Sequence, residues 1–439
     1  MLTHLNPFIL NIVETMISFF SQWKYKALFV ILLISAIKSP SFEFLIVLAF
    51  LSAVFFLNQR KQKISTDFFN ALFPLIILFG LGLFISFFHS YAIVDIFRDI
   101  SYFIKPILLF FVGYALMHSI KDSGFIFKIF VYLGLFFAVW HIFDILTYPK
   151  LFETSINTLR NNTGLSNDIE LIAMIFLFLS LKFSGIQIFK RKQTSYWVLS
   201  LLTVSFILYF SRTMWLAIFL LLLTTFGYAK LSSKALKYIG IVLIIFISFY
   251  VYLYSVEIKR TDEGISAFLY KMKIAPAEIF LSKVNFKNHA NLWDHWRAYE
   301  AKTAFDQMKG FQHITGRGFG SLVDLQFKAP LNEKGMRYIS HLHNGYAMIY
   351  YKTGIIGLIV YLLFVLNLYL FTFYKQNTNQ KFPINNLIAS VGVYLFFSTL
   401  IISGAYNLEE IYLFTLGGFF AFYDKNKKSE NQVSIWQAP

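Results

Sequence analysis

Long apolar stretches separated by short polar connectors make up most of this chain. A window of roughly 19 residues, the length that crosses a bilayer as a helix, marks apolar spans near 26–38, 41–57, 68–88, 100–118, 125–147, 169–189, 195–211, 213–229, 238–255, 345–374, 384–403 and 410–423. This pattern predicts an all-α, polytopic membrane protein with about twelve transmembrane helices. The first two spans and the last are short of the roughly 20 residues that a full crossing needs.

One polar stretch, residues 256–344, is long enough to form a module outside the membrane. At roughly 90 residues it would bury only a small core alone, so we expect it to lie against the helices. The expected organisation is nine transmembrane helices in residues 1–255, this loop module in 256–344, three helices in 345–423 and a tail in 424–439.

Two local patterns stand out within the loop module. Residues 290–309 repeat Leu292, Trp296, Tyr299 and Thr303 at spacings of three and four, which predicts an amphipathic helix that ends at Gly310. Alternate glycines follow at 316, 318 and 320, and they allow a sharp turn or a close approach of backbone to a ligand. A dinucleotide site is not expected there, because no strand and crossover helix flank the glycines.

Composition supports the membrane assignment. Hydrophobic residues make up 57% of the 439 positions and charged residues 14%, and the mean hydropathy is +0.60. The chain has no cysteine. Disulfides, thiolate metal sites and a cysteine nucleophile are therefore excluded.

The formal net charge of +16 is distributed as topology signals. Basic residues cluster in short connectors around Lys61, Arg191 and Lys234, and the enriched connectors all fall on one side of the predicted membrane. The positive-inside rule places these connectors and both termini in the cytoplasm, and the loop module in the periplasm. The charge thus does not indicate a nucleic-acid partner.

The segment His341-Leu342-His343-Asn344 ends the loop module just before a transmembrane span. A histidine at that place can act as a general base near neutral pH, and His343 is our candidate, with Asn344 as a contact to the ring or to a sugar hydroxyl. His341 and His343 could instead form a metal pair, but no carboxylate cluster lies nearby in sequence, and no metal site is predicted.

Arginines are the second group of candidates. Arg212 sits between two apolar runs, where it either reaches lipid headgroups or binds an anion such as pyrophosphate through its planar fork. Arg160 opens a polar loop that turn chemistry alone would also explain. Arg297 lies on the predicted amphipathic helix, and Arg317 in the glycine turn is a candidate acceptor contact or a plain surface residue.

Taken in order, these motifs carry a resemblance. Arg160-x-x-x-Gly164-x-x-Asn167, Ser211-Arg212-x-x-Trp215-Leu216, the Arg297 helix, the glycine turn, His343-Asn344-x-Tyr346 and Gly354-Ile355-Ile356-Gly357 resemble the O-antigen ligase and polymerase superfamily over roughly residues 155–375. The family often has Pro-Asn where this chain has Asn167-Asp168.

The resemblance implies a metal-independent, inverting glycosyltransferase of the bacterial inner membrane with a GT-C-like helical fold and no cofactor. Its donor would be a glycan on undecaprenyl pyrophosphate, and its acceptor lipid A-core for a ligase or another lipid-linked glycan for a polymerase. By similarity, Arg212 and Arg297 would hold the pyrophosphate and His343 would be the base, with the active site facing the periplasm. Membrane lipids are implied partners, and a chain-length regulator is left open.

Other functions also fit parts of this pattern. A polymerase uses the same donor chemistry as a ligase, and the His-Asn and Ser-Arg patterns only incline the comparison toward the ligase. A flippase or transporter of lipid-linked glycans would share the helix count, but it should show internal repeats with interrupted helices. A scaffolding protein gives no reason for charged candidates gathered on one side of the membrane.

Overall fold

The computed structural model describes residues 22–35, 42–58, 64–149, 151, 154, 156–183, 185, 187–230, 233–258, 266, 269–275, 289–330, 335–374, 382–407 and 411–436. Each of the predicted apolar spans lies on a helix. The first falls on residues 22–35, and the others on α2 (Phe42–Asn58), α3 (Thr66–Ser86), α4 (Ile93–Ser119), α5 (Ser123–Leu146), α7 (Asn167–Lys182), α8 (Lys192–Leu208), α9 (Arg212–Thr225), α10 (Ser233–Ser255), α15 (Gly345–Leu370), α16 (Ile384–Ile402) and α17 (Tyr412–Trp436).

Membrane-spanning character is strongest in a subset of these helices. Within the described residues, five helices are long and apolar enough to cross a membrane: Thr66–Ser86, Ile93–Ser119, Ser123–Leu146, Gly345–Phe373 and Ile384–Ile402. Shorter apolar helices cover Phe44–Phe55, Arg212–Thr225 and Leu243–Ser255. The chain is therefore a largely helical, multi-pass membrane protein.

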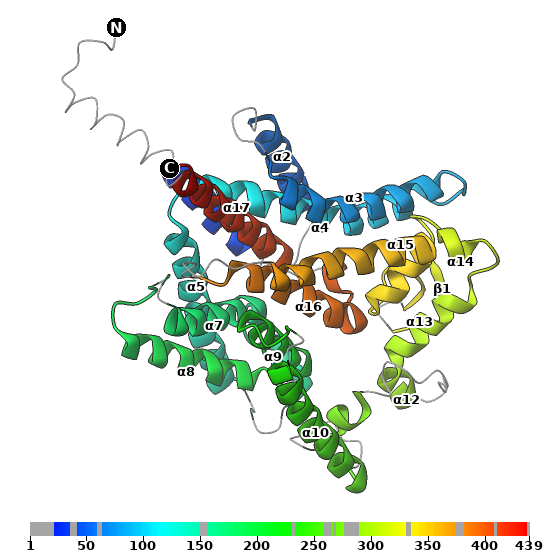
Figure 1. Cartoon of the computed structure of the whole chain (residues 1–439). Helices are drawn as coiled ribbons and strands as arrows, with labels where there is room; N and C mark the ends of the chain where they lie inside the picture. The colour runs from blue at the N-terminus through cyan, green and yellow to red at the C-terminus, as the bar shows by residue number, and fades with distance from the viewer. Residues whose placement is uncertain are drawn as a thin grey trace.

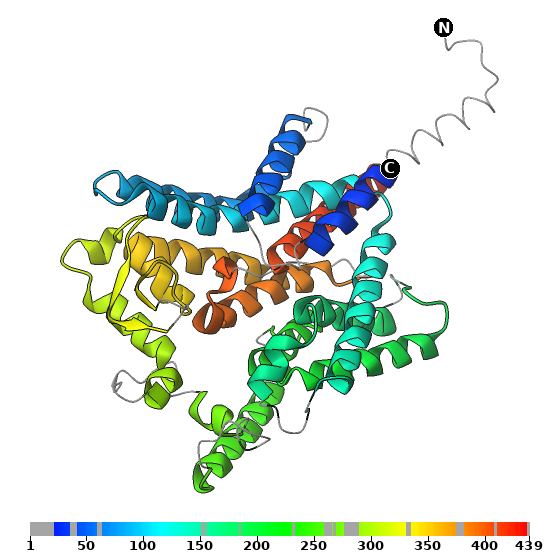
Figure 2. The same ribbon diagram turned by 180° about the vertical axis from the view of Figure 1, so that it is seen from behind.

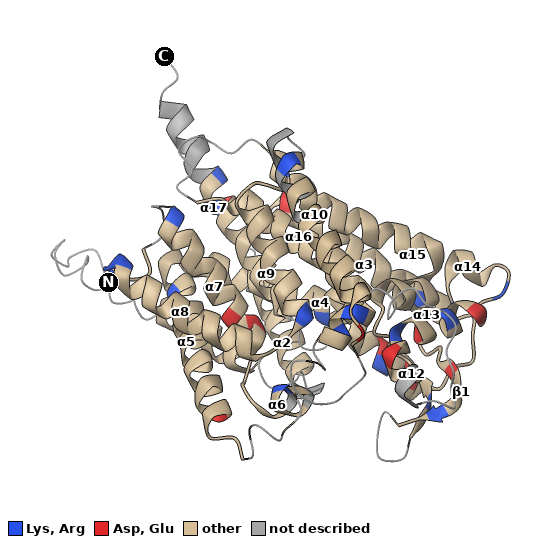
Figure 3. Ribbon diagram, turned by 90° about the horizontal axis from the view of Figure 1, so that it is seen from below, with Lys and Arg blue, Asp and Glu red and all other residues tan. Residues whose placement is uncertain are grey.

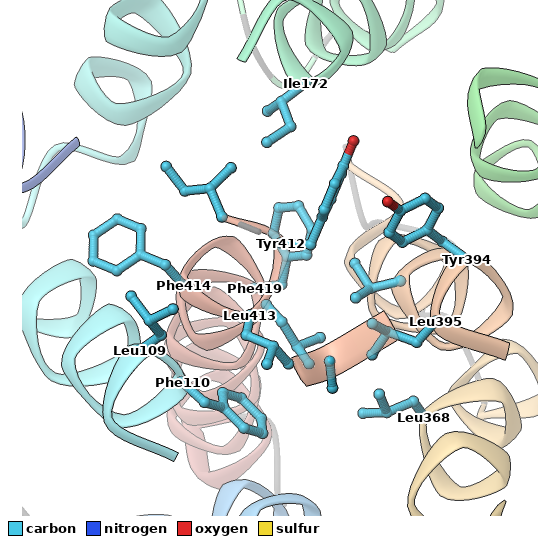
Figure 4. Packing of buried hydrophobic residues seen from close by; sticks show 14 of the residues in the cluster. Leu109, Phe110, Ile172, Leu368, Tyr394, Leu395, Tyr412, Leu413, Phe414 and Phe419 are labelled. Carbon is cyan, nitrogen blue, oxygen red and sulfur yellow. The ribbon is translucent and has the colours of Figure 1, made fainter. Parts of the chain in front are cut away.

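Glycines and aromatic rings let the helices pack closely. On α4, a side chain added at Gly113 would come within 2.1 Å of the carbonyl oxygen of Phe414, so α4 and α17 approach to backbone contact there. Around this contact, Figure 4 shows side chains of α4, α15, α16 and α17 meeting in one cluster, with Ile172 of α7 pointing toward it. This buried centre joins helices that are distant in the sequence.

The loop module lies at one end of the bundle. Figures 1 and 2 show it beside the ends of α3 and α15, away from the end of α17. It contains α12 (His289–Asp294), α13 (Trp296–Asp306), α14 (Gln312–Thr315) and the antiparallel pair β1 (Val323–Ala329) and β2 (Met336–Ile339). The module contacts the bundle, as we expect of a segment that would bury only a small core alone.

Two details of the module differ from the sequence-based expectation. The predicted helix at 290–309 is two helices, because His295 leaves the helical region (φ −124°, ψ 19°) between α12 and α13. The second helix ends at Asp306, before Gly310. The short hairpin β1–β2 is not expected from the sequence, and it adds a small sheet to the described part of a fold that is otherwise helical.

The glycine turn fastens the module to the helices. The backbone N–H of Gly318 donates to the carbonyl of Lys352 (2.9 Å), and that of Phe319 donates to the carbonyl of Gly82 (3.0 Å). Phe319 is fully buried. The alternate glycines therefore allow close approach, as expected, but the partner in this structure is the backbone of α3 and α15.

A buried ion pair supports the same junction. The ammonium of Lys352 on α15 contacts the carboxylate of Asp99 on α4, and both side chains are 1% exposed. The same Asp99 oxygen accepts the backbone N–H of Gly320 at 2.7 Å. A buried charge pair of this kind is stable only when further hydrogen bonds satisfy it, and the glycine turn supplies one.

We expect Gly354→Ala to weaken the contact between α14 and α15 and so to destabilise the protein. Gly354 has φ +66°, and an added Cβ would lie 2.1 Å from the carbonyl oxygen of Ile314. The strained backbone alone should cost roughly 1 kcal/mol or more. A thermal-unfolding assay in detergent should show a lower Tm than for Gly80→Ala, since nothing lies within 4 Å of a Cβ at Gly80. Equal Tm values for the two variants would contradict the docking.

Candidate functional site

Charged residues gather where the loop module meets the helices. Figure 3 shows Lys, Arg, Asp and Glu concentrated around α4, α12, α13 and β1, while α9, α15 and α16 are tan over most of their length. Charge in a membrane protein is costly away from water or partners. This concentration marks the end of the bundle where polar chemistry is possible.

Three of the predicted arginines come together here from separate segments. Arg160 lies on the short helix α6 (Ile156–Asn162), Arg212 begins α9, and Arg297 is on α13. Burial and then the positive charges of Arg212 and Arg297 hold the pKa of the Arg160 guanidinium below its usual range. The charges of Arg212 and Arg297 are thus close enough to Arg160 to lower its pKa. Three like charges at one place favour a bound anion, because it would offset their repulsion.

The backbone between α8 and α9, just before Arg212, is strained. Phe210 between α8 and α9 has φ +48°, a region that bulky residues rarely adopt. Ser211 is the N-cap residue of α9, and its hydroxyl contacts that of Thr213 at 3.0 Å. Arg212 therefore occupies the first turn of α9, where the helix dipole also favours an anion.

Arg212 contacts the loop module through Lys271. The Arg212 guanidinium donates to the carbonyl oxygen of Lys271. The Lys271 ammonium lies 3.0 Å from the carboxylate of Asp294, a side chain of α12 that is 5% exposed. Lys271 therefore connects the start of α9 with α12, the helix that comes just before the Arg297 helix α13.

A pocket opens at the start of α9. Its polar lining includes Asn167 and Asp168 from the start of α7, Thr213 from α9, and Asn407. The remaining lining is mostly apolar and comes from α9 and α16: Met214, Leu216, Ala217, Leu220, Tyr394, Phe397, Ser398, Ile401 and Ile402. The pocket thus combines a few polar residues, one of which is Thr213 next to Arg212 in the sequence, with an apolar wall along two helices, and this combination suits an amphipathic ligand.

His343 is held by a buried carboxylate. Its ring nitrogen Nδ1 lies 2.9 Å from Oε2 of Glu300, and its backbone N–H donates to the same oxygen at 3.0 Å. The Glu300 side chain is 1% exposed, whereas that of His343 is 49% exposed. The imidazole is therefore fixed on one side by α13 and open on the other.

His341 has a different environment. Its Nε2 lies 3.0 Å from the hydroxyl of Ser403, which donates to the carbonyl of Leu342 at 2.8 Å. Burial, followed by the electrostatic effect of the neighbouring His343, Lys352 and Lys105, lowers the pKa of His341 to about 4. His341 is therefore neutral at physiological pH, and its contacts hold the backbone beside His343.

The other two predicted site residues have contacts within the protein. The side-chain oxygen of Asn344 accepts the backbone N–H of Ala347 at 3.1 Å, so Asn344 is the N-cap of α15. The Arg317 guanidinium donates to the hydroxyl of Tyr351 at 2.7 Å and lies over its ring. These contacts give both residues a role in positioning the glycine turn and the start of α15.

Three carboxylates outside the loop module, Asp168, Glu409 and Glu410, are alternative candidates for the base. Asp168 lines the pocket and accepts a hydrogen bond from the Tyr412 hydroxyl at 3.3 Å, whereas Glu409 and Glu410 lie outside the described residues. In the part of the chain that the structure describes, no group of three or more His, Asp or Glu side chains could hold a metal ion.

Sequence reasoning missed Glu300, Lys271 and Ser403. One signal pointed to Glu300: it follows Arg297 by three residues on the predicted helix, which places the two side chains on neighbouring faces. Nothing in the local sequence distinguished Lys271 or Ser403, because each acts through a contact with a distant segment.

A comparison with known proteins finds a family model that matches part of the chain. Residues 197–362 match the family model described as O-antigen ligase. That range contains Arg212, Arg297, Glu300 and His343, while Arg160 precedes it. Searches of curated proteins and of solved structures found no match. Residues 197–362 of this chain are thus similar to the O-antigen ligase family.

Proposed function

We propose that this protein transfers a glycan from an undecaprenyl-pyrophosphate donor to an acceptor glycan, in the manner of an O-antigen ligase with lipid A-core as acceptor. The reaction would take place at the periplasmic face of the bacterial inner membrane. The observation that carries the proposal is the convergence of Arg160, Arg212 and Arg297 on the module whose α13 also holds His343.

The arginines suit the donor end of the reaction. When the glycosidic bond to the lipid carrier breaks, negative charge grows on the departing pyrophosphate, and fixed cations aimed at it lower the barrier. Guanidinium groups can bind such oxygens through paired hydrogen bonds without a divalent ion. The apolar wall of the pocket is formed by α9, the helix that begins at Arg212, and by α16, and it would suit the first isoprene units of the carrier.

The histidine suits the acceptor end. The attacking sugar hydroxyl must lose its proton as it bonds to the anomeric carbon, and a base in hydrogen-bond reach typically contributes 10²–10⁴-fold. His343 has an open side from which a hydroxyl could approach. A single displacement with this base would invert the anomeric centre. The proposed enzyme is therefore an inverting, metal-independent glycosyltransferase.

The polymerase remains the second candidate, because polymerases use the same donor chemistry with a different acceptor. A flippase is less well supported, since translocation gives no reason for a histidine held by a buried carboxylate beside the arginines. Arg317 and Asn344 have positioning contacts, so we assign neither to the substrate in this proposal.

Lipopolysaccharide from a strain lacking the gene tests this function. We expect a gel to show core with no repeat units, because a ligase attaches the finished glycan to core. Core carrying a single repeat unit would instead identify a polymerase. An unchanged ladder would contradict both assignments, and complementation with the wild-type gene is the control for polar effects.

A further inference from the structure

Glu300 makes its contacts at the point where proton transfer is expected. Its two carboxylate oxygens lie 3.1 and 2.9 Å from Nδ1 of His343, and the backbone N–H of His343 reaches the nearer one. We propose that Glu300 is a positioning residue that fixes the tautomer of His343, so that Nε2 is the nitrogen that accepts the acceptor proton. This inference rests on the proposed function.

The tautomer follows from what each group can donate. An ionised carboxylate only accepts hydrogen bonds, so the ring nitrogen that faces it must carry the hydrogen. A neutral imidazole has one N–H, and with Nδ1 protonated the lone pair is on Nε2. His343 is half-exposed while Glu300 is buried. Nε2 is therefore the nitrogen free to meet a sugar hydroxyl.

The chemical step balances with this arrangement. The acceptor O–H bond breaks and its proton moves to Nε2, while the oxygen forms a bond to the anomeric carbon. The bond from that carbon to the pyrophosphate oxygen breaks, and its electron pair leaves with the lipid pyrophosphate. The imidazolium that results lies against the Glu300 carboxylate, which stabilises the new positive charge.

Burial makes the carboxylate specific for this partner. A buried carboxylate is unfavourable unless charged or hydrogen-bonded groups surround it. The backbone N–H and the ring Nδ1 of His343 face Glu300 in the ground state, and after proton transfer the ring carries a full positive charge. The attraction between Glu300 and His343 is thus stronger in the transition state than in the ground state. An interaction of this kind accelerates a reaction.

Helix α13 joins the two halves of the site. Arg297 precedes Glu300 by three residues, less than one helical turn. The helix is fixed to β1 by the Tyr299 hydroxyl, which donates to the carbonyl of Leu325 at 2.5 Å, and by the buried Trp296. A single rigid element therefore sets the position of a proposed donor-binding cation and of the base.

Two other described residues, His341 and Ser403, lie beside His343. His341, two residues away, is neutral because burial and nearby positive charges lower its pKa to about 4. Ser403 reaches the backbone carbonyl of His343 rather than its ring. Among the described contacts to the imidazole, Glu300 is the acidic partner.

The test is Glu300→Gln in a transfer assay with purified protein in lipid. Glutamine keeps the shape and can still accept from Nδ1, but it has no charge. We expect kcat to fall about 10- to 100-fold with little change in KM for the lipid-linked donor.

Matched variants separate positioning from simple fold maintenance. Asp306→Asn removes a charge from the same helix at an exposed ion pair with Lys302, and it should leave kcat unchanged. Glu300→Asp keeps the charge at a shorter reach and should retain more activity than Glu300→Gln. In a His343→Ala background, Glu300→Gln should cost almost nothing further, since the two groups act as a unit.

Three results would overturn the role of Glu300 while the proposed function stood. They are full kcat in Glu300→Gln, a higher activity for Gln than for Asp, and costs that multiply in the double variant. Absence of transfer by the wild-type protein would instead overturn the proposed function and this inference together. Retained donor binding by Glu300→Gln is the check that the variant is folded.

Discussion

Replacing His343 with alanine is expected to slow glycan transfer by roughly 10²–10⁴-fold, the range for loss of a general base. Donor binding should survive, because it is assigned to Arg160, Arg212 and Arg297 on other segments. The predicted change is thus in kcat rather than in the affinity for donor. Single-turnover transfer and equilibrium binding of a lipid-linked glycan measure the two separately.

The pH dependence should follow the same residue. Wild-type activity should fall as the medium becomes acidic, since a protonated His343 cannot accept the hydroxyl proton. His341 does not account for such a fall near neutrality, because its pKa of about 4 keeps it neutral there. His341→Ala should therefore have much the smaller effect. Loss of donor binding with an intact transfer step in His343→Ala would make His343 a substrate ligand instead of the base.

Arg212→Lys is expected to lose most of the activity although the charge is kept. Lysine has no planar fork, so the paired hydrogen bonds to two pyrophosphate oxygens are lost. Loss of one charge-assisted bond, about 1.5–3 kcal/mol, corresponds to roughly 10- to 100-fold in rate or affinity. Steady-state transfer with a lipid-linked donor measures it. The matched control is Arg191→Lys, at the exposed start of α8, which should be silent.

A contrary outcome would reassign Arg212. The guanidinium also donates to the carbonyl of Lys271, so the residue could serve only to hold that segment. Full activity of Arg212→Lys at a normal protein level would support that structural role, or an interfacial one, and remove the residue from the donor site.

The helices were predictable from the sequence because lipid-facing and buried positions are both apolar. Every predicted span falls on a helix, from residues 22–35 to α17. How many of these helices cross the membrane does not follow as directly, since length and apolarity single out five in the described residues.

The loop module was harder to predict because its structure depends on distant partners. The break at His295 and the hairpin β1–β2 have no strong local signal. The glycine turn was visible as a place of close approach, but its partners on α3 and α15 were not. These contacts join residues more than 30 positions apart, which pattern reasoning on neighbouring residues cannot reach.

The candidate site also has residues that the sequence indicates and one that it does not. Arg160, Arg212, Arg297 and His343 could be chosen because their residue types suit anion binding and proton transfer at the ends of apolar spans. Glu300 was not chosen, because a carboxylate on an amphipathic helix is usually a solvated side chain. Only its burial and its two contacts with His343 distinguish it.

The central claim is that this protein catalyses glycan transfer, and reconstitution tests it most directly. Purified protein in liposomes would receive undecaprenyl-pyrophosphate glycan and lipid A-core, with His343→Ala as the matched inactive control. The account predicts glycan joined to lipid A-core with release of undecaprenyl pyrophosphate in equal amount, by the wild type only. Movement of the donor across the bilayer without any new glycosidic bond would contradict it and identify a transporter.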